Sequence, residues 1–203
     1  MKTKKVLLLL SNGFEAYEAS VFTDVLGWNK QKGDGCTEVI TCGGREKLKC
    51  TWNFTVIPEM LLSEVDLNMF DALAIPGGFE EAGFYTDAFS DEFLSVIREF
   101  DRANKIIASI CVGALPVGRS GVLKGRKGTT YHLNNGYRQD QLASYGVEIV
   151  DQLMVIDKNI ITSSCPSTAL NVAFTLLEML TSLENCYKVK HLMGFNKEGL
   201  TNE

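Results

Sequence analysis

Histidine is scarce in this chain, and the patterns by which zinc sites are recognised are absent. Only two histidines, His132 and His191, occur in 203 residues, and no two of the six cysteines form a C-x-x-C pair. Zinc proteins usually combine such pairs with further cysteine or histidine ligands. We therefore expect no metal site, and we interpret the cysteines as free thiols of a protein that stays in the reducing cytoplasm.

An excess of positive charge and long apolar segments are also missing. The net charge is −5 and the pI is about 5.2, so no basic field would attract nucleic acid. The apolar run at residues 6–10 is shorter than the core of a signal peptide, and no other stretch approaches the length of a transmembrane helix. We expect neither a nucleic-acid partner nor a membrane.

No linker, repeat or low-complexity stretch divides the chain. Apolar runs of strand length alternate with segments of helical period, which is typical of an α/β fold with a mostly parallel sheet covered on both faces. We expect one domain over residues 1–203, with a core at about 4–182 and a C-terminal tail at 183–203. The predicted strands are 5–10, 38–42, 54–57, 71–75, 106–110, 128–131, 152–156 and 160–162, and the predicted helices are 16–29, 91–103, 135–145 and 168–180.

Cys111 follows a predicted buried strand and precedes a helical segment, with the small residues Ser109 and Gly113 on either side. This pattern is typical of a nucleophile elbow, in which a strand turns sharply into a helix. A thiol at a helix amino terminus lies in a field that favours thiolate, so we expect Cys111 to be partly exposed, with a pKa below the usual value of about 8.5. The alternative is a buried core cysteine, which is our interpretation of the other five.

Two further strand ends belong to the predicted site. Gly77 and Gly78 follow the strand at 71–75, where they form either a simple turn or, with the amide of Val112, a pocket for a developing oxyanion. Glu15 and Glu18 begin the first helix, where carboxylates complement the helix dipole. We accept this account for Glu15.

Four segments together resemble the ThiJ/PfpI superfamily, also called the DJ-one/PfpI superfamily, in order and spacing over residues 4–182. They are residues 13–18 (GFEAYE), 76–78 (PGG), 108–114 (ASICVGA) and 123–130 (LKGRKGTT). The resemblance implies a flavodoxin-like three-layer sandwich related to class I glutamine amidotransferases. It also implies that Glu18 pairs with the elbow cysteine and that the protein is a homodimer.

The sequence departs from some branches of the superfamily. Peptidases of the PfpI type carry histidine directly after the nucleophile, where this chain has Val112, and related glutaminases use a His-x-Glu pair that is absent around His191. Relatives often place histidine after two threonines, where this chain has Tyr131, and His132 comes one position later. Either His132, as a base, or Tyr131 is expected to face Cys111, whereas His191 is taken as structural.

The resemblance leaves three hypotheses for function. The first is a cofactor-independent enzyme that acts on small reactive carbonyls, as a glyoxalase III or a deglycase does. Cys111 would attack the carbonyl, Glu18 would move a proton, and Gly78 with Val112 would hold the oxyanion. The second is hydration of an isonitrile, and the third is a redox-sensing stress-response protein with an oxidisable cysteine.

Overall fold

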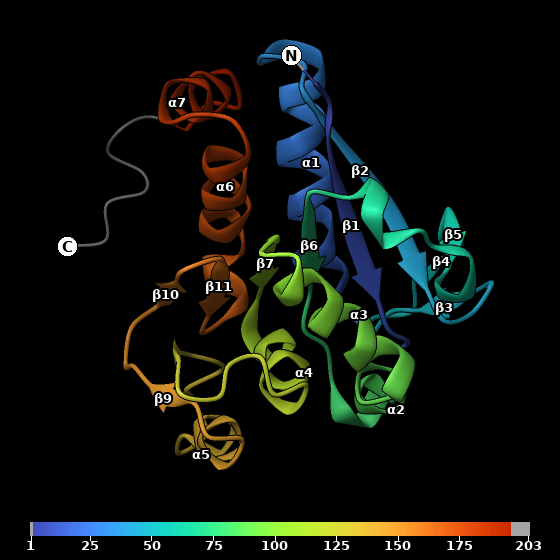
Figure 1. The fold of residues 1–203 in the computed structure, drawn as a ribbon, viewed down its shortest axis with the longest axis vertical. Coiled ribbons are helices and arrows are strands. Elements are labelled where there is room, and N and C mark those ends of the chain that lie inside the picture. Colours follow the sequence, from blue (N-terminus) through green and yellow to red (C-terminus); the bar gives the residue numbers. More distant parts are fainter. Residues whose placement is uncertain (1, 196–203) are drawn as a thin grey trace.

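The computed structural model describes residues 2–195, with a seven-stranded sheet at its centre (Figure 1). The strand order is β10-β11-β7-β6-β1-β2-β5, and every pairing is parallel except that of β10 with β11. The expected mostly parallel sheet is confirmed. Its strands are β1 (Lys4–Leu10), β2 (Thr37–Gly43), β5 (Met60–Leu61), β6 (Ala72–Ile75), β7 (Ile106–Ser109), β10 (Met154–Asp157) and β11 (Ile160–Ser163).

Helices cover both faces of this sheet, as expected for a three-layer sandwich. One layer contains α1 (Ala16–Lys32), α6 (Ala169–Leu180) and α7 (Leu183–Leu192), which pack on one another. The other contains α2 (Phe84–Ala88), α3 (Asp91–Arg102) and α4 (Ala114–Arg119), with α5 (Tyr137–Ser144) against α4. Because both faces are covered, the central strands are continuous apolar runs: β6 is buried throughout, and β1 is buried from Val6 to Leu10.

The shortest elements were not all predicted. The antiparallel pair β3 (Leu48–Lys49) and β4 (Thr55–Val56) and the parallel pair β8 (Lys127–Gly128) and β9 (Glu148–Ile149) lie outside the central sheet. β4 lies within the predicted strand at 54–57, and β8 overlaps the predicted strand at 128–131, but β3 and β9 were not predicted, since strands of two residues carry little periodicity. The remaining short turns are the 3-10 helices η1 (Leu62–Glu64), η2 (Leu67–Met69), η3 (Glu80–Ala82), η4 (Cys111–Gly113) and η5 (Pro166–Thr168).

Helix α7 changes the interpretation of the C-terminal end. Residues 183–192 were assigned to a tail, but they form a helix that packs on α1 and α6. The buried Asn185 side chain donates a hydrogen bond of 2.7 Å to Asn29 Oδ1 of α1. These ten residues therefore belong to the folded body, whereas residues 196–203 of the predicted tail lie outside the described part of the chain.

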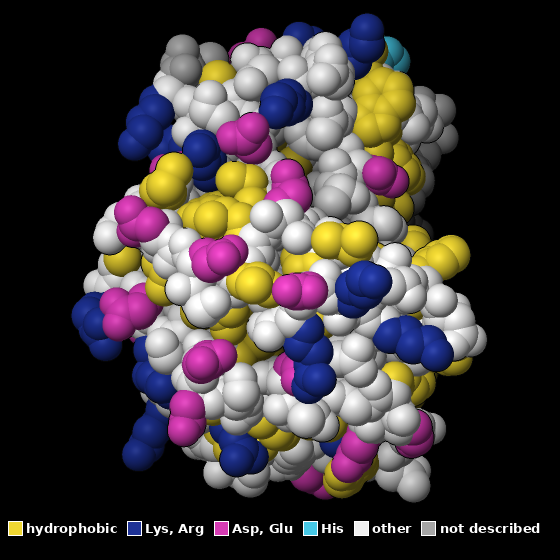
Figure 2. Space-filling view, turned by 90° about the vertical axis from the view of Figure 1, so that its right-hand side faces the viewer, with side chains coloured by type: hydrophobic (Ala, Val, Ile, Leu, Met, Phe, Trp, Pro, Cys, Tyr) yellow, Lys and Arg dark blue, Asp and Glu magenta, His cyan; other side chains and the backbone are white. Residues whose placement is uncertain are grey.

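One face of the molecule carries charges of both signs. Figure 2 shows one face on which separate hydrophobic patches alternate with acidic and basic side chains. Within residues 2–195, no helix has the length and apolar character needed to cross a bilayer.

Candidate active site around Cys111

Cys111 occupies a sharp turn between β7 and α4. Its φ of 53° lies in the left-handed region, which is uncommon for any residue other than glycine, asparagine or aspartate. The surrounding backbone holds it there: the Ile110 N–H donates to Ile75 O (3.1 Å), and the Thr130 hydroxyl donates to the Cys111 carbonyl (2.8 Å). Such strain persists only where the surrounding structure enforces it, and it is common at functional sites.

Gly113 allows this turn to lie close to the neighbouring strand. A Cβ atom at this position would be 2.7 Å from Ile75 O and 2.9 Å from Pro76 O, which is too close for any side chain. Ser109, on the other side of the turn, is buried and donates to Ile161 O of β11 (3.1 Å). A residue without a side chain is thus required at Gly113, and Ser109 is held by burial and its hydrogen bond.

The expected exposure of Cys111 is wrong. Only 6% of the residue is accessible to solvent, and this burial is the main reason why the pKa of its thiol lies well above the ordinary value. The backbone N–H of Val112 acts in the opposite direction, because it donates toward the sulfur. The sequence showed the helix amino terminus but not the depth at which the thiol lies.

Glu18 reaches the same place from the first turn of α1. Its side chain is fully buried, and its Oε2 accepts a short hydrogen bond of 2.6 Å from the Gly77 N–H. Its Oε1 has no hydrogen-bond partner among the described residues. The pKa of Glu18 is raised to about 8, chiefly by burial and to a smaller extent by the charge of Glu15. Glu18 is therefore protonated at neutral pH. Its unpartnered Oε1 is the atom that could carry this proton and donate it to a neighbouring group.

Glu18 and Cys111 influence one another. A charge on Glu18 raises the pKa of the Cys111 thiol, and the neighbouring thiol lowers the pKa of Glu18. The separation of Sγ and Oε1 does not meet the geometry of a formed hydrogen bond, since Oε1 remains unpartnered. The two acids nevertheless form one coupled pair, whose protons are lost in steps that belong to both groups.

The two glycines differ in their availability to a ligand. The Gly77 amide is bound to Glu18, so it is not the free oxyanion donor that we expected. The Gly78 amide donates to no acceptor among residues 2–195, and Gly78 lines the cleft beside Cys111. Gly78 also has a packing role, because a Cβ there would lie 2.2 Å from Gly13 O. Val112 lines the same cleft, so its amide and that of Gly78 remain the candidate donors.

Of the two residues that compete for the position beside Cys111, Tyr131 lines the cleft. His132 is half-buried, and its Nδ1 lies 3.4 Å from Cys165 Sγ. The hydrogen bond of His132 therefore goes to the second cysteine of the site and not to Cys111. His191 is exposed in the last turn of α7.

The cleft over Cys111 has a volume of about 620 Å³. Three carboxylates line it, those of Glu15, Glu80 and Glu81, together with one cation, Arg138. Arg138 is held by Glu80 Oε2 (2.8 Å) and packs against the rings of Tyr85 and Tyr137. The cleft is large enough for a small molecule, and its lining includes the Cys111 thiol and Gly78 with its free amide. Glu18 is fully buried and does not line the cleft itself.

Comparison of the chain with known proteins decides its family. The model of the DJ-1/PfpI family matches residues 4–179. The chain belongs to the DJ-1/PfpI family. Protein DJ-1 homolog B of Arabidopsis thaliana is 29% identical over 188 residues, which are 92% of this chain and 40% of that protein. A deglycase of Pyrococcus horikoshii is 31% identical over 163 residues, 80% of this chain and 91% of that protein. The crystal structure of Drosophila melanogaster DJ-1beta superposes with a TM-score of 0.83 at 26% identity, covering 96% of this chain and 99% of that chain.

Two residues of this DJ-1/PfpI site were missed from the sequence. Glu15 was interpreted as a helix cap, but its side chain caps no amide and lines the cleft, where burial raises its pKa. Cys165 was interpreted as a core cysteine. It follows β11 closely, and β11 lies next to β7, so the rule that ligands bind at the carboxyl ends of parallel strands would have found it.

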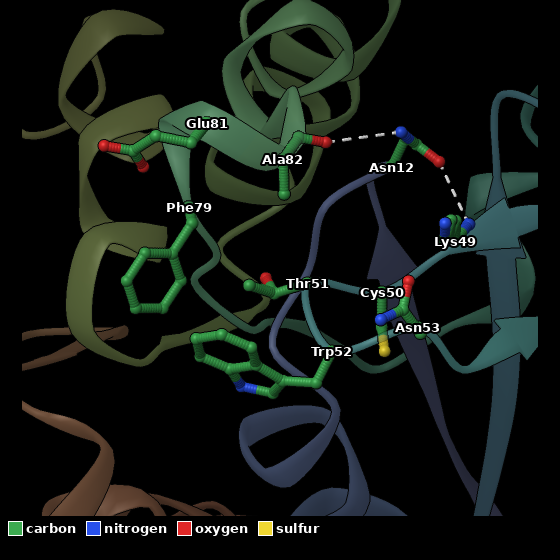
Figure 3. Close-up of a pocket in the computed structure, with 9 residues that line it drawn as sticks. All are labelled: Asn12, Lys49, Cys50, Thr51, Trp52, Asn53, Phe79, Glu81 and Ala82. Carbon is green, nitrogen blue, oxygen red and sulfur yellow. Dashed lines mark hydrogen bonds between the residues drawn. The ribbon is translucent and has the colours of Figure 1, made fainter.

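A second pocket adjoins the cleft and shares Phe79 and Glu81 with it. Figure 3 shows Trp52 and Phe79 facing one another, with ring centroids 5.2 Å apart in an edge-to-face arrangement. On the other side of this pocket, Asn12 donates to Ala82 O (3.4 Å) and accepts from the Lys49 N–H (2.9 Å). The Asn12 contacts join the two loops that carry Trp52 and Phe79, and Phe79 lines both this pocket and the cleft.

Proposed function

We propose that this DJ-1/PfpI protein is a cofactor-independent cysteine enzyme that acts on small reactive carbonyls, as a glyoxalase III or a deglycase does. The pairing of Cys111 with a protonated Glu18 supports the proposal most directly, because it supplies a nucleophile and a proton donor without any bound group. The name of the related Pyrococcus horikoshii protein, a deglycase, points to the same chemistry. We place the protein in the cytosol, where the six cysteines, all free, would stay reduced.

The pair must lose one proton before the sulfur can attack. The pKa of Glu18 is about 8 and that of the Cys111 thiol lies well above its ordinary value, so the carboxyl loses its proton first and is half deprotonated near pH 8. The remaining proton then lies on sulfur. The reactive form arises when this proton passes from Cys111 to the Glu18 carboxylate, because the Val112 N–H favours negative charge on sulfur and the free Oε1 of Glu18 can carry the proton.

Attack on an aldehyde forms the carbon–sulfur bond and moves the carbonyl electrons onto oxygen. The amides of Gly78 and Val112 would stabilise that oxygen while it takes the proton from Glu18, and the product is a hemithioacetal beside a carboxylate. With a 2-oxoaldehyde, the carboxylate can remove the proton from the hemithioacetal carbon, which gives an enediol as the neighbouring carbonyl oxygen takes up a proton. The proton on Glu18 then returns to the adjacent carbon while the hydroxyl on the sulfur-bearing carbon gives up its proton and becomes the thioester carbonyl. The resulting thioester is hydrolysed by water, which releases a 2-hydroxy acid and the free thiol.

The test is turnover of 2-oxoaldehydes by the wild type and by Cys111→Ser, without added cofactor, with isonitriles and peptides in the same panel. We expect 2-hydroxy acid from 2-oxoaldehydes with the wild type alone. The control is Cys36→Ser, because Cys36 is equally buried but lies outside the cleft. Turnover of isonitriles only, or equal activity of Cys111→Ser, would reject the proposal.

A further inference from the structure

Cys165 is a second thiol in the cleft of Cys111. It is 8% exposed, and it precedes Pro166 and η5 at the end of β11, the strand beside β7. Its sulfur lies 3.4 Å from His132 Nδ1. Cys111 and Cys165 both line the same cleft.

The other four cysteines lack these features. The sulfur of Cys186 donates to Phe174 O (3.3 Å), that of Cys36 donates to Asp34 O (3.5 Å), and that of Cys50 accepts from the Phe54 N–H (3.1 Å). Burial raises the pKa of Cys42 to about 12. None of the four lines the cleft of Cys111. The combination of a shared cleft and a neighbouring imidazole is therefore particular to Cys165 in the described part of the chain.

We propose that Cys165 is a resolving thiol, which forms a disulfide with Cys111 after a hydroperoxide has oxidised Cys111. In the first step, the Cys111 thiolate attacks the hydroperoxide, the O–O bond breaks, and Cys111 becomes a sulfenic acid while an alcohol or water leaves. In the second step, His132 Nδ1 takes the proton of Cys165, the Cys165 sulfur attacks Cys111 Sγ, and the sulfenic oxygen leaves as water. The product is an intramolecular disulfide.

The electrostatics of the site agree with this pairing. Burial and the charge of Glu18 are the larger causes that raise the pKa of the Cys111 thiol, and a charge on Cys165 raises it further, which agrees with the place of both residues in one cleft. A sulfenic acid without a resolving thiol is oxidised further to sulfinic acid, which thiols do not reduce. The disulfide instead returns to the active dithiol with a thiol reductant. Cys165 would thus protect the nucleophile of the proposed enzyme.

The test is oxidation of the reduced full chain with hydrogen peroxide, followed by proteolysis without reductant and mass spectrometry. We expect the wild type to give a Cys111–Cys165 linked peptide, with the protein lighter by two hydrogens, and dithiothreitol to reverse this change. Cys165→Ser and Cys165→Ala should instead accumulate Cys111 sulfinic acid, heavier by two oxygens. His132→Asn should form the disulfide roughly tenfold more slowly or worse, because the general base is lost.

Cys36→Ser is the matched control and should behave as the wild type. The proposal is overturned if the wild type gives no linked peptide and forms sulfinic acid as fast as Cys165→Ser, or if Cys111 is not oxidised at all. The inference rests on the reactive Cys111 of the proposed function but not on carbonyl turnover. A protein that forms the disulfide without consuming 2-oxoaldehydes would contradict only the proposed function.

Discussion

Glu18 is a carboxyl group at a position where a charge is costly. It is fully buried, one oxygen is bound to the Gly77 amide, and the other has no hydrogen-bond partner among the described residues. In the unfolded chain such a group loses its proton near pH 4.5, whereas in the native protein it does so near pH 8. Between these values the native state holds more protons than the unfolded state, so its stability must fall as the pH rises.

The first prediction concerns this slope. The free energy of unfolding of the wild type should fall relative to Glu18→Gln between about pH 4.5 and 8, by at most about 1.4 kcal/mol per pH unit for the one proton. Below pH 4.5 the difference should be constant, because the carboxyl is then protonated in both states. Urea denaturation at a series of pH values measures it, with Glu46→Gln, an exposed loop residue, as the control. Parallel curves for the wild type and Glu18→Gln would contradict the shifted pKa.

The second prediction concerns the Cys111 thiol. The charge of Glu18 raises the pKa of this thiol. Glu18→Gln removes that charge and supplies an amide that can donate to the sulfur, so the thiol pKa should be lower in this variant than in the wild type. Glu18→Leu removes the charge and also the donor, so its thiol pKa should be higher than in Glu18→Gln. The ultraviolet absorbance of the thiolate against pH measures both, with Cys111→Ser as the blank. Identical titrations in all three proteins would mean that the two groups are not coupled.

At this scale the sequence predicted Cys111 and Glu18 as site residues but not their burial. Ser109 and Gly113 indicated the turn, and at Gly113 the structure shows that no side chain fits beside Ile75 O and Pro76 O, which is a local requirement. The depth of the thiol depends on segments far away in the chain, among them the loop with Tyr131 and the turn with Cys165, and no local pattern contains this information.

Among the secondary-structure elements, the long ones were predictable and the contacts between them were not. The strands β1, β6 and β7 are apolar runs that are followed or ended by proline or polar residues. Helix α3 has a clear apolar face, and its amino terminus is capped by Ser90, whose hydroxyl accepts from the Phe93 N–H. Helix α7 has a weak apolar pattern, and it is held by packing and by the Asn185–Asn29 hydrogen bond. Such a helix becomes visible only when its partners are in place.

The third prediction tests the turn between β7 and α4. Gly113 has φ −59° and ψ −19°, which alanine adopts freely, so any cost of Gly113→Ala must come from the lack of space beside Ile75 O and Pro76 O. We expect a loss of about 1–3 kcal/mol in the free energy of unfolding and reduced alkylation of Cys111. Gly27→Ala in α1 is the control, because a Cβ there meets nothing within 4 Å.

Gly27→Ala should raise the stability by up to about 1 kcal/mol, since alanine is the better helix former. Thermal and urea unfolding of both variants compare the two sites directly. Equal effects at Gly113 and Gly27 would show that the close approach at the elbow is not what constrains the turn.

At the scale of the whole molecule, the apolar surface is larger than the sheet and its helices need for their own core. Tyr17, Trp52 and Phe54 are exposed and border a hollow of about 650 Å³ whose floor includes Leu8 and Leu10 of β1. Nearby in the chain, Ile57 is 71% exposed. Contiguous apolar surface of this kind usually marks an interface. Because closed homodimers are the commonest assemblies, a second copy of the chain is the simplest partner.

The fourth prediction is therefore that the protein is a homodimer whose interface includes Phe54. Light scattering at micromolar concentration should give twice the chain mass of 22.4 kDa for the wild type and a single chain mass for Phe54→Asp, because a carboxylate in an apolar interface loses its hydration without gaining a partner. Tyr187→Asp is the control: Tyr187 is similarly exposed but lies on α7, outside this hollow, so its variant should stay dimeric. A monomeric wild type would reject the dimer. A dimer that survives Phe54→Asp but not Tyr187→Asp would move the interface to the α7 side, and the hollow beside Tyr17 would then need another explanation.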